Sequence, residues 1–268
     1  MMRIIPVKRI VPVLIAALSI TLMTACVNNQ ETHVIVSGST SVQPYIEVLA
    51  EEYEFLHPEK AIDVQGGGSS AGIMAVESGI ADIGMSSRPL KDDELHLWVI
   101  QIAKDGLAMI VHPDNPVSNL SWTQVRKVYT GEITNWRELG GADKRIHIIA
   151  REEGSGTRGA FEDLVMREDR ITPRAIVQSS NGAVRQLVSG DPDSIGFISL
   201  GLVDETVKAL QLNGIAATRE NVMDSSYTLY RPFLFIAKEE PTGYAAQFVE
   251  YVLSPEGKQL MITEGLIP

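Results

Sequence analysis

Three short segments rich in glycine, serine and threonine carry residue types that can bind a small anion. They are Ser37–Ser41, Gly66–Ser70 and Gly154–Thr157, and each follows a β-rich run and precedes a helical pattern. The first backbone N–H groups of a helix lack partners and carry partial positive charge. Glycine lets an anion approach the backbone, and the hydroxyl groups add donors. In open α/β sheets, ligands bind at the edge where such turns gather, so the pattern predicts an anion site.

The three turns do not match nucleotide-binding loops, since the sequence has neither G-x-x-x-x-G-K-[ST] nor G-x-G-x-x-G after the first strand. We therefore expect a small anion held mostly by neutral dipoles. Arg151, which precedes the third turn, can give an oxyanion two hydrogen bonds. For Arg158, a ligand contact and a solvated helix position both remain open. Asn181-Gly182 forms either a fourth donor turn or a simple cap.

Strand-like and helix-like runs alternate along most of the chain. Strands are expected at 33–36, 61–64, 80–85, 107–111, 146–150, 195–199 and 233–237. Helices are expected at 46–57, 73–77, 121–129, 157–165, 244–253 and 255–264, and Ser121 is a plausible N-cap. This alternation predicts an α/β fold with a largely parallel sheet, arranged as two similar-sized lobes around a cleft.

The N-terminus has the pattern of an export signal. Arg3, Lys8 and Arg9 precede an apolar run over 10–23, and Thr24-Ala25-Cys26 resembles a lipoprotein processing box. We expect a signal peptide at 1–25 and a lipidated Cys26 that begins a tether over 26–32. The alternative is a plain signal peptide with an incidental cysteine. Cys26 is the single cysteine of the chain, so no internal disulfide can form.

The composition excludes several classes of protein. The chain has 268 residues, of which 44% are hydrophobic and 21% charged, as in globular proteins. Without residues 1–25 it keeps 20 basic and 34 acidic side chains, a formal charge of −14. That balance, without a basic cluster beyond the first ten residues, argues against nucleic acid as a partner. The five histidines lack metal-ligand spacing, so we expect no metal site.

Several segments together resemble the phosphate-binding protein of the high-affinity phosphate ABC transporter. The resemblance covers nearly all of the chain after the signal, in order, and the Arg-x-x-Gly-Ser-Gly-Thr run is its most specific part. The segments that carry it are residues 37–41, 66–72, 82–88, 129–136, 151–158, 195–201 and 253–257.

The resemblance implies a type II periplasmic-binding-protein-like fold, with two α/β lobes around a ligand cleft joined by a two-strand hinge. Lobe 1 is expected at 31–110 plus 232–268 and lobe 2 at 111–231, with crossings near Val111 and Arg231. It implies a monomeric, exported receptor that is lipid-anchored to the outer face of the cell membrane or periplasmic. Its partners would be inorganic phosphate and the permease and ATPase subunits of an ABC importer, with no cofactor.

The resemblance also implies the ligand-binding residues and the role of an acidic neighbour. In the family, an acidic residue in the third turn orients the arginine, and here it falls on Glu153. Classical family members carry a proton-accepting aspartate after the third strand, where this chain has Ser87. Either Glu153 supplies the acceptor, or discrimination between phosphate and sulfate is weaker. The implied phosphate ligands are Ser39, Thr40, Ser41, Ser69, Ser70, Ser87, Arg151, Glu153, Ser155, Gly156 and Thr157.

Two other functions remain open from the sequence. One is a receptor for another tetrahedral oxyanion, namely sulfate, molybdate or tungstate, which the loss of the acceptor aspartate allows. The other is a secreted phosphohydrolase with Ser155 or Ser69 as nucleophile, which needs a base or a metal within reach. No G-x-S-x-G or S-x-x-K motif is present, so the sequence favours a binding protein without catalytic residues.

Overall fold

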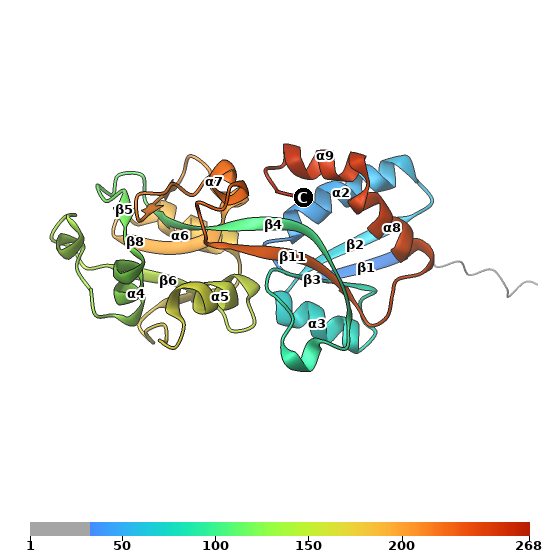
Figure 1. The fold of residues 1–268 in the computed structure, drawn as a ribbon, viewed down its shortest axis with the longest axis horizontal. Coiled ribbons are helices and arrows are strands. Elements are labelled where there is room, and N and C mark those ends of the chain that lie inside the picture. The colour runs from blue at the N-terminus through green and yellow to red at the C-terminus, as the bar shows by residue number, and fades with distance from the viewer. Residues whose placement is uncertain (1–32) are drawn as a thin grey trace, which may run out of the picture. The chain divides into compact units, whose positions relative to one another are not determined.

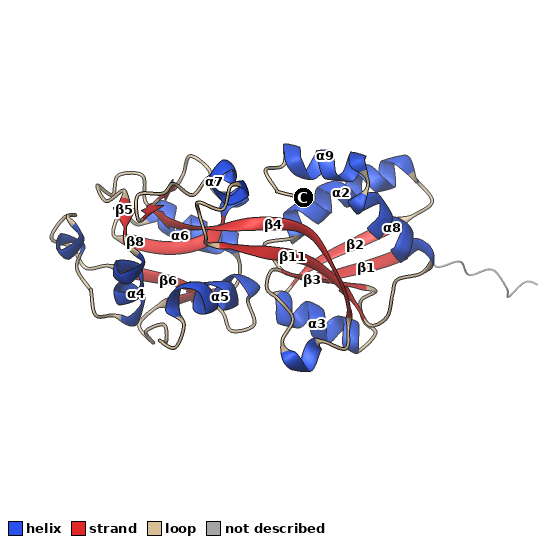
Figure 2. Ribbon diagram, in the orientation of Figure 1, coloured by secondary structure: helices blue, strands red, loops and turns tan. Residues whose placement is uncertain are grey.

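The computed structural model describes residues 33–268, and the predicted alternation of strands and helices is present in it (Figures 1 and 2). The predicted signal peptide, Cys26 and the tether over 26–32 lie outside the described residues. Within residues 33–268 no helix combines the length and the apolar character needed to cross a bilayer.

The strands and helices have the following bounds. The strands are β1 (His33–Gly38), β2 (Ala61–Gly66), β3 (Ile83–Ser86), β4 (Trp98–Val111), β5 (Asn119–Leu120), β6 (His147–Arg151), β7 (Ile176–Gln178), β8 (Ser194–Ser199), β9 (Lys208–Ala209), β10 (Gln211–Leu212) and β11 (Tyr230–Ala237). The helices are α2 (Gln43–Leu56), α3 (Ser69–Glu77), α4 (Trp122–Thr130), α5 (Gly156–Phe161), α6 (Asn181–Gly190), α7 (Arg219–Met223), α8 (Gly243–Leu253) and α9 (Pro255–Thr263).

Local signals placed most element boundaries within a few residues. Ser121 caps α4 as predicted, since its side chain accepts from the Gln124 N–H while the Gln124 side chain accepts from the Ser121 N–H. The prediction for 107–111 was too short, because β4 spans Trp98–Val111. Charged Lys104 and Asp105 interrupt the apolar pattern there, although Asp105 is buried.

The sheet is mixed, which corrects the expectation of a largely parallel one. Its strand order is β2-β1-β3-β11-β4-β8-β6-β7, with β9 beside β4. Strands β2, β1 and β3 are parallel to one another, and so are β8, β6 and β7. Strands β11 and β4 between them run antiparallel to their neighbours. The parallel prediction therefore holds at both ends of the sheet and fails at its centre, where the chain passes between the two ends.

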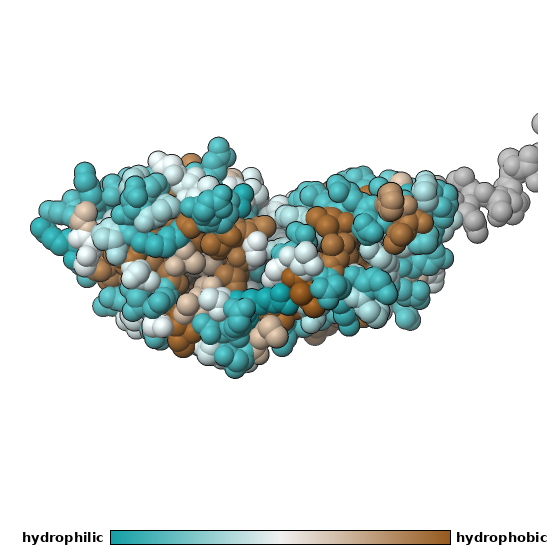
Figure 3. All heavy atoms as spheres, turned by 90° about the horizontal axis from the view of Figure 1, so that it is seen from above, coloured by the Kyte–Doolittle hydropathy of each residue, from teal (hydrophilic) through white to brown (hydrophobic). Residues whose placement is uncertain are grey.

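The apolar side chains gather into separate interiors. One cluster packs Val34, Ile46 and Phe233 around the strands β1–β3, and another packs Leu107, Phe161 and Phe197 around β6 and β8. We call the two regions lobe 1 and lobe 2. Leu107 belongs to the second cluster, so residues 107–110 pack with lobe 2 although the expected boundary assigned them to lobe 1. In the space-filling view, hydrophilic surface covers most of both lobes, with hydrophobic areas interspersed (Figure 3).

The register of the parallel strands brings the predicted turns together within each lobe. Gly38 at the end of β1 pairs with Gly66 at the end of β2 and with Met85 of β3. Arg151 at the end of β6 likewise pairs with Gln178 at the end of β7. Strands β4 and β11 run from one lobe to the other (Figure 1), so the strand ends of both lobes belong to one continuous sheet.

Candidate anion-binding site

Hydroxyl groups from both lobes meet at the strand ends and are buried there. The Oγ of Ser41, which follows β1, lies 2.8 Å from the Oγ1 of Thr157 in the first turn of α5. The Nδ2 of Asn181, at the start of α6, donates to the same Ser41 oxygen at 2.8 Å. All three side chains are at most 1% exposed. Three segments far apart in the sequence therefore form one polar cluster between the lobes.

A second group of hydroxyls comes from lobe 1 alone. Ser39 donates to the Oγ of Ser87 at 2.9 Å, and the Ser87 N–H donates to the Oγ of Ser69 at 3.1 Å. Each residue follows one of the strands β1, β2 and β3. Because the register aligns those strand ends, the three serines converge although 48 residues separate Ser39 from Ser87.

The guanidinium of Arg151, at the end of β6, joins the lobes. Its Nη2 donates to the Oγ1 of Thr40 in lobe 1 at 3.1 Å, and its Nη1 lies 3.4 Å from the Oγ1 of Thr157. The carbonyls of Gln178 and Ser179 accept from it at 3.2 Å each. Arg151 is 1% exposed, so its charge is directed at the hydroxyl cluster rather than at water.

Glu152, rather than the expected Glu153, pairs with Arg151. Both Glu152 carboxylate oxygens accept from the guanidinium, at 2.9 Å from Nε and 2.8 Å from Nη2. The Glu153 side chain is 92% exposed and lies 4.0 Å from Arg158. The turn after β6 points adjacent residues in different directions, and residue spacing alone did not show which one faces the arginine.

A second buried ion pair lies beside the hydroxyls, at residues that no sequence pattern marks as part of the site. Arg231 of β11 donates through Nε and Nη2 to Oδ2 of Asp105 in β4, at 3.1 and 3.0 Å. Burial raises the pKa of Asp105 and lowers the pKa of Arg231, since both charged forms lose water, while their mutual attraction opposes both shifts. No turn motif surrounds either residue, so local sequence offered no signal.

Three of the expected ligands, Ser70, Glu153 and Ser155, line a groove beside this buried cluster. Ser70 of lobe 1 and Ser155 of lobe 2 both border a groove of about 1130 Å³, together with Arg88 and Arg158. Ser155 also caps α5, because its Oγ accepts from the Arg158 N–H at 3.3 Å. The Arg158 guanidinium pairs with Glu162 at 2.8 Å, which favours its helix-surface interpretation.

Gly156 lies at a close approach of the two lobes. A Cβ at this position would collide with the Oγ of Ser69 and lie 2.5 Å from the Oγ of Ser87. The Ser70 N–H donates to the carbonyl of Gly154 across the same contact, at 3.1 Å. Glycine is therefore required for the lobes to meet as they do.

The lining consists of hydrogen-bond donors. The Oγ of Ser41 already accepts from Asn181 and Arg231, and the Oγ of Ser87 from Ser39 and Arg231. Each hydroxyl can therefore act further only as a donor, and the Ser41 hydroxyl donates to Thr157 Oγ1 in this structure. Ser199 occupies the other Asp105 oxygen at 2.7 Å. A ligand that brings only acceptor oxygens, such as a tetrahedral oxyanion, satisfies this arrangement.

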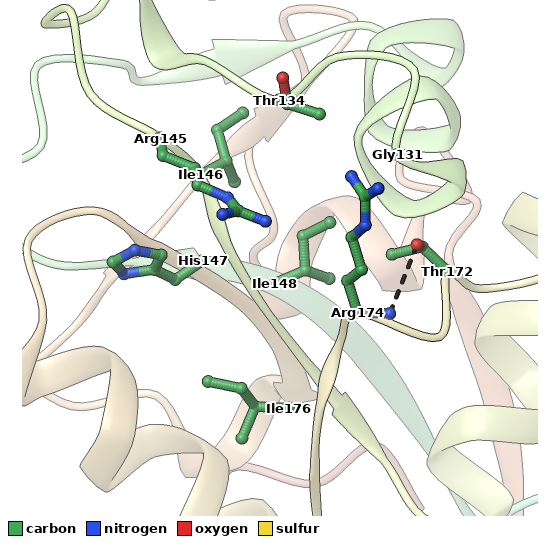
Figure 4. Close-up of a pocket in the computed structure, with 9 residues that line it drawn as sticks. All are labelled: Gly131, Thr134, Arg145, Ile146, His147, Ile148, Thr172, Arg174 and Ile176. Atoms are coloured by element: carbon green, nitrogen blue, oxygen red, sulfur yellow. Dashed lines mark hydrogen bonds between the residues drawn. The ribbon is translucent and has the colours of Figure 1, made fainter.

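Two other kinds of site can be judged by their geometry, namely a metal site and a second pocket. Residues 33–268 contain no group of three or more histidine, cysteine, aspartate and glutamate side chains placed to hold a metal ion. A smaller pocket of about 110 Å³ lies near the start of β6, with Arg145, His147 and Arg174 around it (Figure 4). It lies at the opposite end of β6 from Arg151, and Arg145 and Arg174 are exposed, so it is not part of the hydroxyl cluster.

The assignment of Glu152 as the partner of Arg151 can be tested by measuring the free energy of unfolding. Glu152→Gln removes a charged acceptor from a buried guanidinium, so we expect the unfolding free energy to fall by about 1–2 kcal/mol in urea titrations of the ligand-free protein. The exposed Glu153→Gln is the matched control and should change it by less than about 0.5 kcal/mol. Equal effects of the two variants would contradict the assignment.

The chain is similar to several known proteins. The model of a PBP superfamily domain matches residues 25–256. The phosphate-binding protein PstS of Bacillus subtilis (strain 168) is 32% identical over 240 residues, which cover 87% of this chain and 79% of that protein. A putative phosphate ABC transporter substrate-binding protein of Clostridium perfringens, solved with bound phosphate, is 42% identical with a TM-score of 0.85, covering 88% of this chain and 98% of that one.

A second solved structure agrees with these matches. An ABC-type phosphate transport receptor from Vibrio cholerae is 40% identical with a TM-score of 0.74, and the match covers 88% of this chain and 99% of that one. The chain therefore belongs to the PBP superfamily and, within it, to the PstS family of phosphate-binding proteins.

Proposed function

We propose that this protein is an extracytoplasmic receptor that captures inorganic phosphate and delivers it to an ABC importer. The observation that carries the proposal is the convergence of donors from both lobes, in which Arg151 and Thr157 of lobe 2 contact Thr40 and Ser41 of lobe 1. The relatives named as phosphate-binding proteins and phosphate transport receptors support the same ligand class and the ABC importer as partner.

A phosphate ion bound here would replace contacts between hydroxyl groups. The bonds Ser41–Thr157 and Ser39–Ser87 join groups that can each donate to a ligand oxygen. Charge-assisted hydrogen bonds from Arg151 would add to them, and these are about twice as strong as neutral ones. Because the site is buried, bulk salt would screen these interactions little.

Closure of the lobes would couple binding to delivery. We propose that lobe 1 (33–106 plus 232–268) moves against lobe 2 (107–231), with strands β4 and β11 as the connection, and that the closed form docks on the permease. The contacts across the lobes at Ser41, Thr40 and Gly154 are those expected of a closed arrangement. Opening would break them and admit water and ligand.

The geometry supports a binding protein rather than a phosphohydrolase. Among the described residues, the side-chain hydrogen-bond partners of Ser69 and Ser155 are Ser87 and the Arg158 N–H. Neither serine has a histidine, lysine or carboxylate partner that could take its proton. A tight site with no general base holds its ligand without converting it.

The first experiment is calorimetric titration of residues 27–268, stripped of ligand by unfolding and refolding, with phosphate and with sulfate as competitor. We expect tight phosphate binding. We also expect sulfate to compete, with discrimination below about 10⁴-fold, because Ser87 carries no charge to repel it and Glu153 is exposed. Absence of phosphate binding would refute the receptor function, and strict exclusion of sulfate would refute only the relaxed selectivity.

The variant Gly156→Ala tests whether phosphate binding requires the close approach of the two lobes. The added Cβ would overlap Ser69, and overpacking of this size costs about 1–3 kcal/mol, so phosphate affinity should fall about 10- to 100-fold. Gly159→Ala in the same helix is the matched control, since its Cβ meets only the Cδ of Arg88 at 3.4 Å. Unchanged affinity of Gly156→Ala in calorimetry would show that the lobes need not approach this closely.

We further propose that Cys26 is lipidated and anchors the receptor to the outer face of the membrane. The support is the processing box Thr24-Ala25-Cys26 after the apolar run. In the native host, radiolabelled palmitate should enter the protein and Cys26→Ser should abolish the labelling. A Cys26→Ser variant that still incorporates the label would contradict the proposal, and a Ser19→Ala variant is the control for changes within the signal.

A further inference from the structure

The Asp105–Arg231 pair lies where the chain passes between the lobes. The two residues are directly opposite each other in the antiparallel ladder of β4 and β11. On either side of them, Ala103 and Phe233 pack into lobe 1, whereas Leu107 and Tyr230 pack into lobe 2. The pair is therefore at the point that both lobes share.

The carboxylate of Asp105 is fully used within the protein. Its Oδ2 accepts from Nε and Nη2 of Arg231, and its Oδ1 accepts from the Oγ of Ser199 at 2.7 Å. Its side chain is 2% exposed. Asp105 therefore holds one edge of the guanidinium and, through Ser199 at the end of β8, is tied to lobe 2.

The other edge of the guanidinium faces the hydroxyl cluster. Nη2 of Arg231 donates to the Oγ of Ser41 at 2.9 Å, and Nη1 donates to the Oγ of Ser87 at 3.3 Å. Nη1 carries two hydrogens and has one acceptor among the described residues, so one N–H is left for a ligand. The Arg231 guanidinium also lies 5.5 Å from the centre of the Phe233 ring, which restricts its position.

A buried ion pair adds little to stability by itself, because desolvation offsets the attraction. A pair with a purely structural role would need an acceptor for every N–H. Four of the five N–H groups of Arg231 have an acceptor in Asp105, Ser41 or Ser87, and an incoming oxyanion would supply the fifth. Its charge would also offset the unfavourable approach of two guanidinium groups, Arg151 and Arg231, in one buried region.

We propose that Arg231 is a second anion-binding cation of this site, in addition to Arg151, and that Asp105 is the positioning residue that holds it. The inference rests on the proposed function and deepens it. Each cation is balanced by its own carboxylate, Glu152 for Arg151 and Asp105 for Arg231, so the preference comes from the donor lining. The phosphate dianion has one hydroxyl that must donate and the monoanion has two, so a site lined by donors would prefer the dianion. Phosphate affinity would then rise between pH 6 and pH 8, as the dianion becomes the main form in solution.

The test replaces both charges at once, so that no buried charge is left without a partner. In the double variant Asp105→Asn/Arg231→Gln we expect cooperative unfolding, as in the wild type, and phosphate affinity about 10- to 100-fold weaker by calorimetry. The increase in affinity from pH 6 to pH 8 should also shrink, a change that a structural role of the pair would not produce. The matched control is Arg185→Gln/Asp204→Asn, which removes an ion pair of 3.0 Å in lobe 2 and should bind as the wild type.

Each outcome decides a different claim. A folded double variant that binds phosphate like the wild type, with the same pH dependence, would overturn the inference and leave the receptor function intact. A wild type that fails to bind phosphate would overturn the receptor function and this inference with it. If the double variant does not fold, Arg231→Lys keeps the charge but loses the two-point geometry. It should then bind about 10-fold more weakly, and unchanged affinity would overturn the inference.

Discussion

Two guanidinium groups that cannot lose their charge are buried where the lobes meet, and the rest of the site is arranged around them. Arg151 and Arg231 are 1% and 2% exposed. Because a buried unpaired charge is very costly, each arginine has a carboxylate at one edge, Glu152 and Asp105. The free edges then direct donors toward Thr40, Ser41, Ser87 and Thr157. These hydroxyls accept from the arginines, so toward a ligand oxygen they can act as donors. The carboxylates of Glu152 and Asp105 thus accept hydrogen bonds from protein groups.

The mixed sheet explains how such distant residues meet. Parallel pairing within each lobe aligns the ends of β1, β2 and β3, and those of β6, β7 and β8, so that short polar turns gather at each edge. Antiparallel pairing of β4 and β11 places Asp105 opposite Arg231, 126 residues away. The same two strands connect the lobes. The register of β4 with β11 therefore places the Asp105–Arg231 pair at the position where the chain passes between the lobes. Gly156 permits the close approach because a side chain there would meet Ser69.

Local patterns predicted much of this architecture and part of the site. The capping of α4 by Ser121 and the positions of the three turns depend on residues within a few positions of one another, and they were read correctly. The extent of β4 was not, because Lys104 and Asp105 resemble a loop until their burial is known. The choice between Glu152 and Glu153 depends on the backbone direction of one turn. For Asn181 the sequence allows both a cap and a donor, and it reaches Ser41, 140 positions away in the sequence, only because the chain returns to the other lobe.

The sequence by itself determined the repeated strand–turn–helix pattern, the donor character of the turns and the family resemblance, since these depend on residue type and on neighbours along the chain. Only the tertiary structure decided which carboxylate balances Arg151 and that Arg231 and Asp105 lie beside the hydroxyls. It also decided that Ser70 and Ser155 border the groove, whereas Ser41 and Ser87 lie in the hydroxyl cluster. The physical reason is that the energy of a charge pair or of a buried hydroxyl depends on which groups it contacts and on how much water it loses. For these residues, the register of β4 with β11 and the approach of the two lobes determine the contacts and the burial.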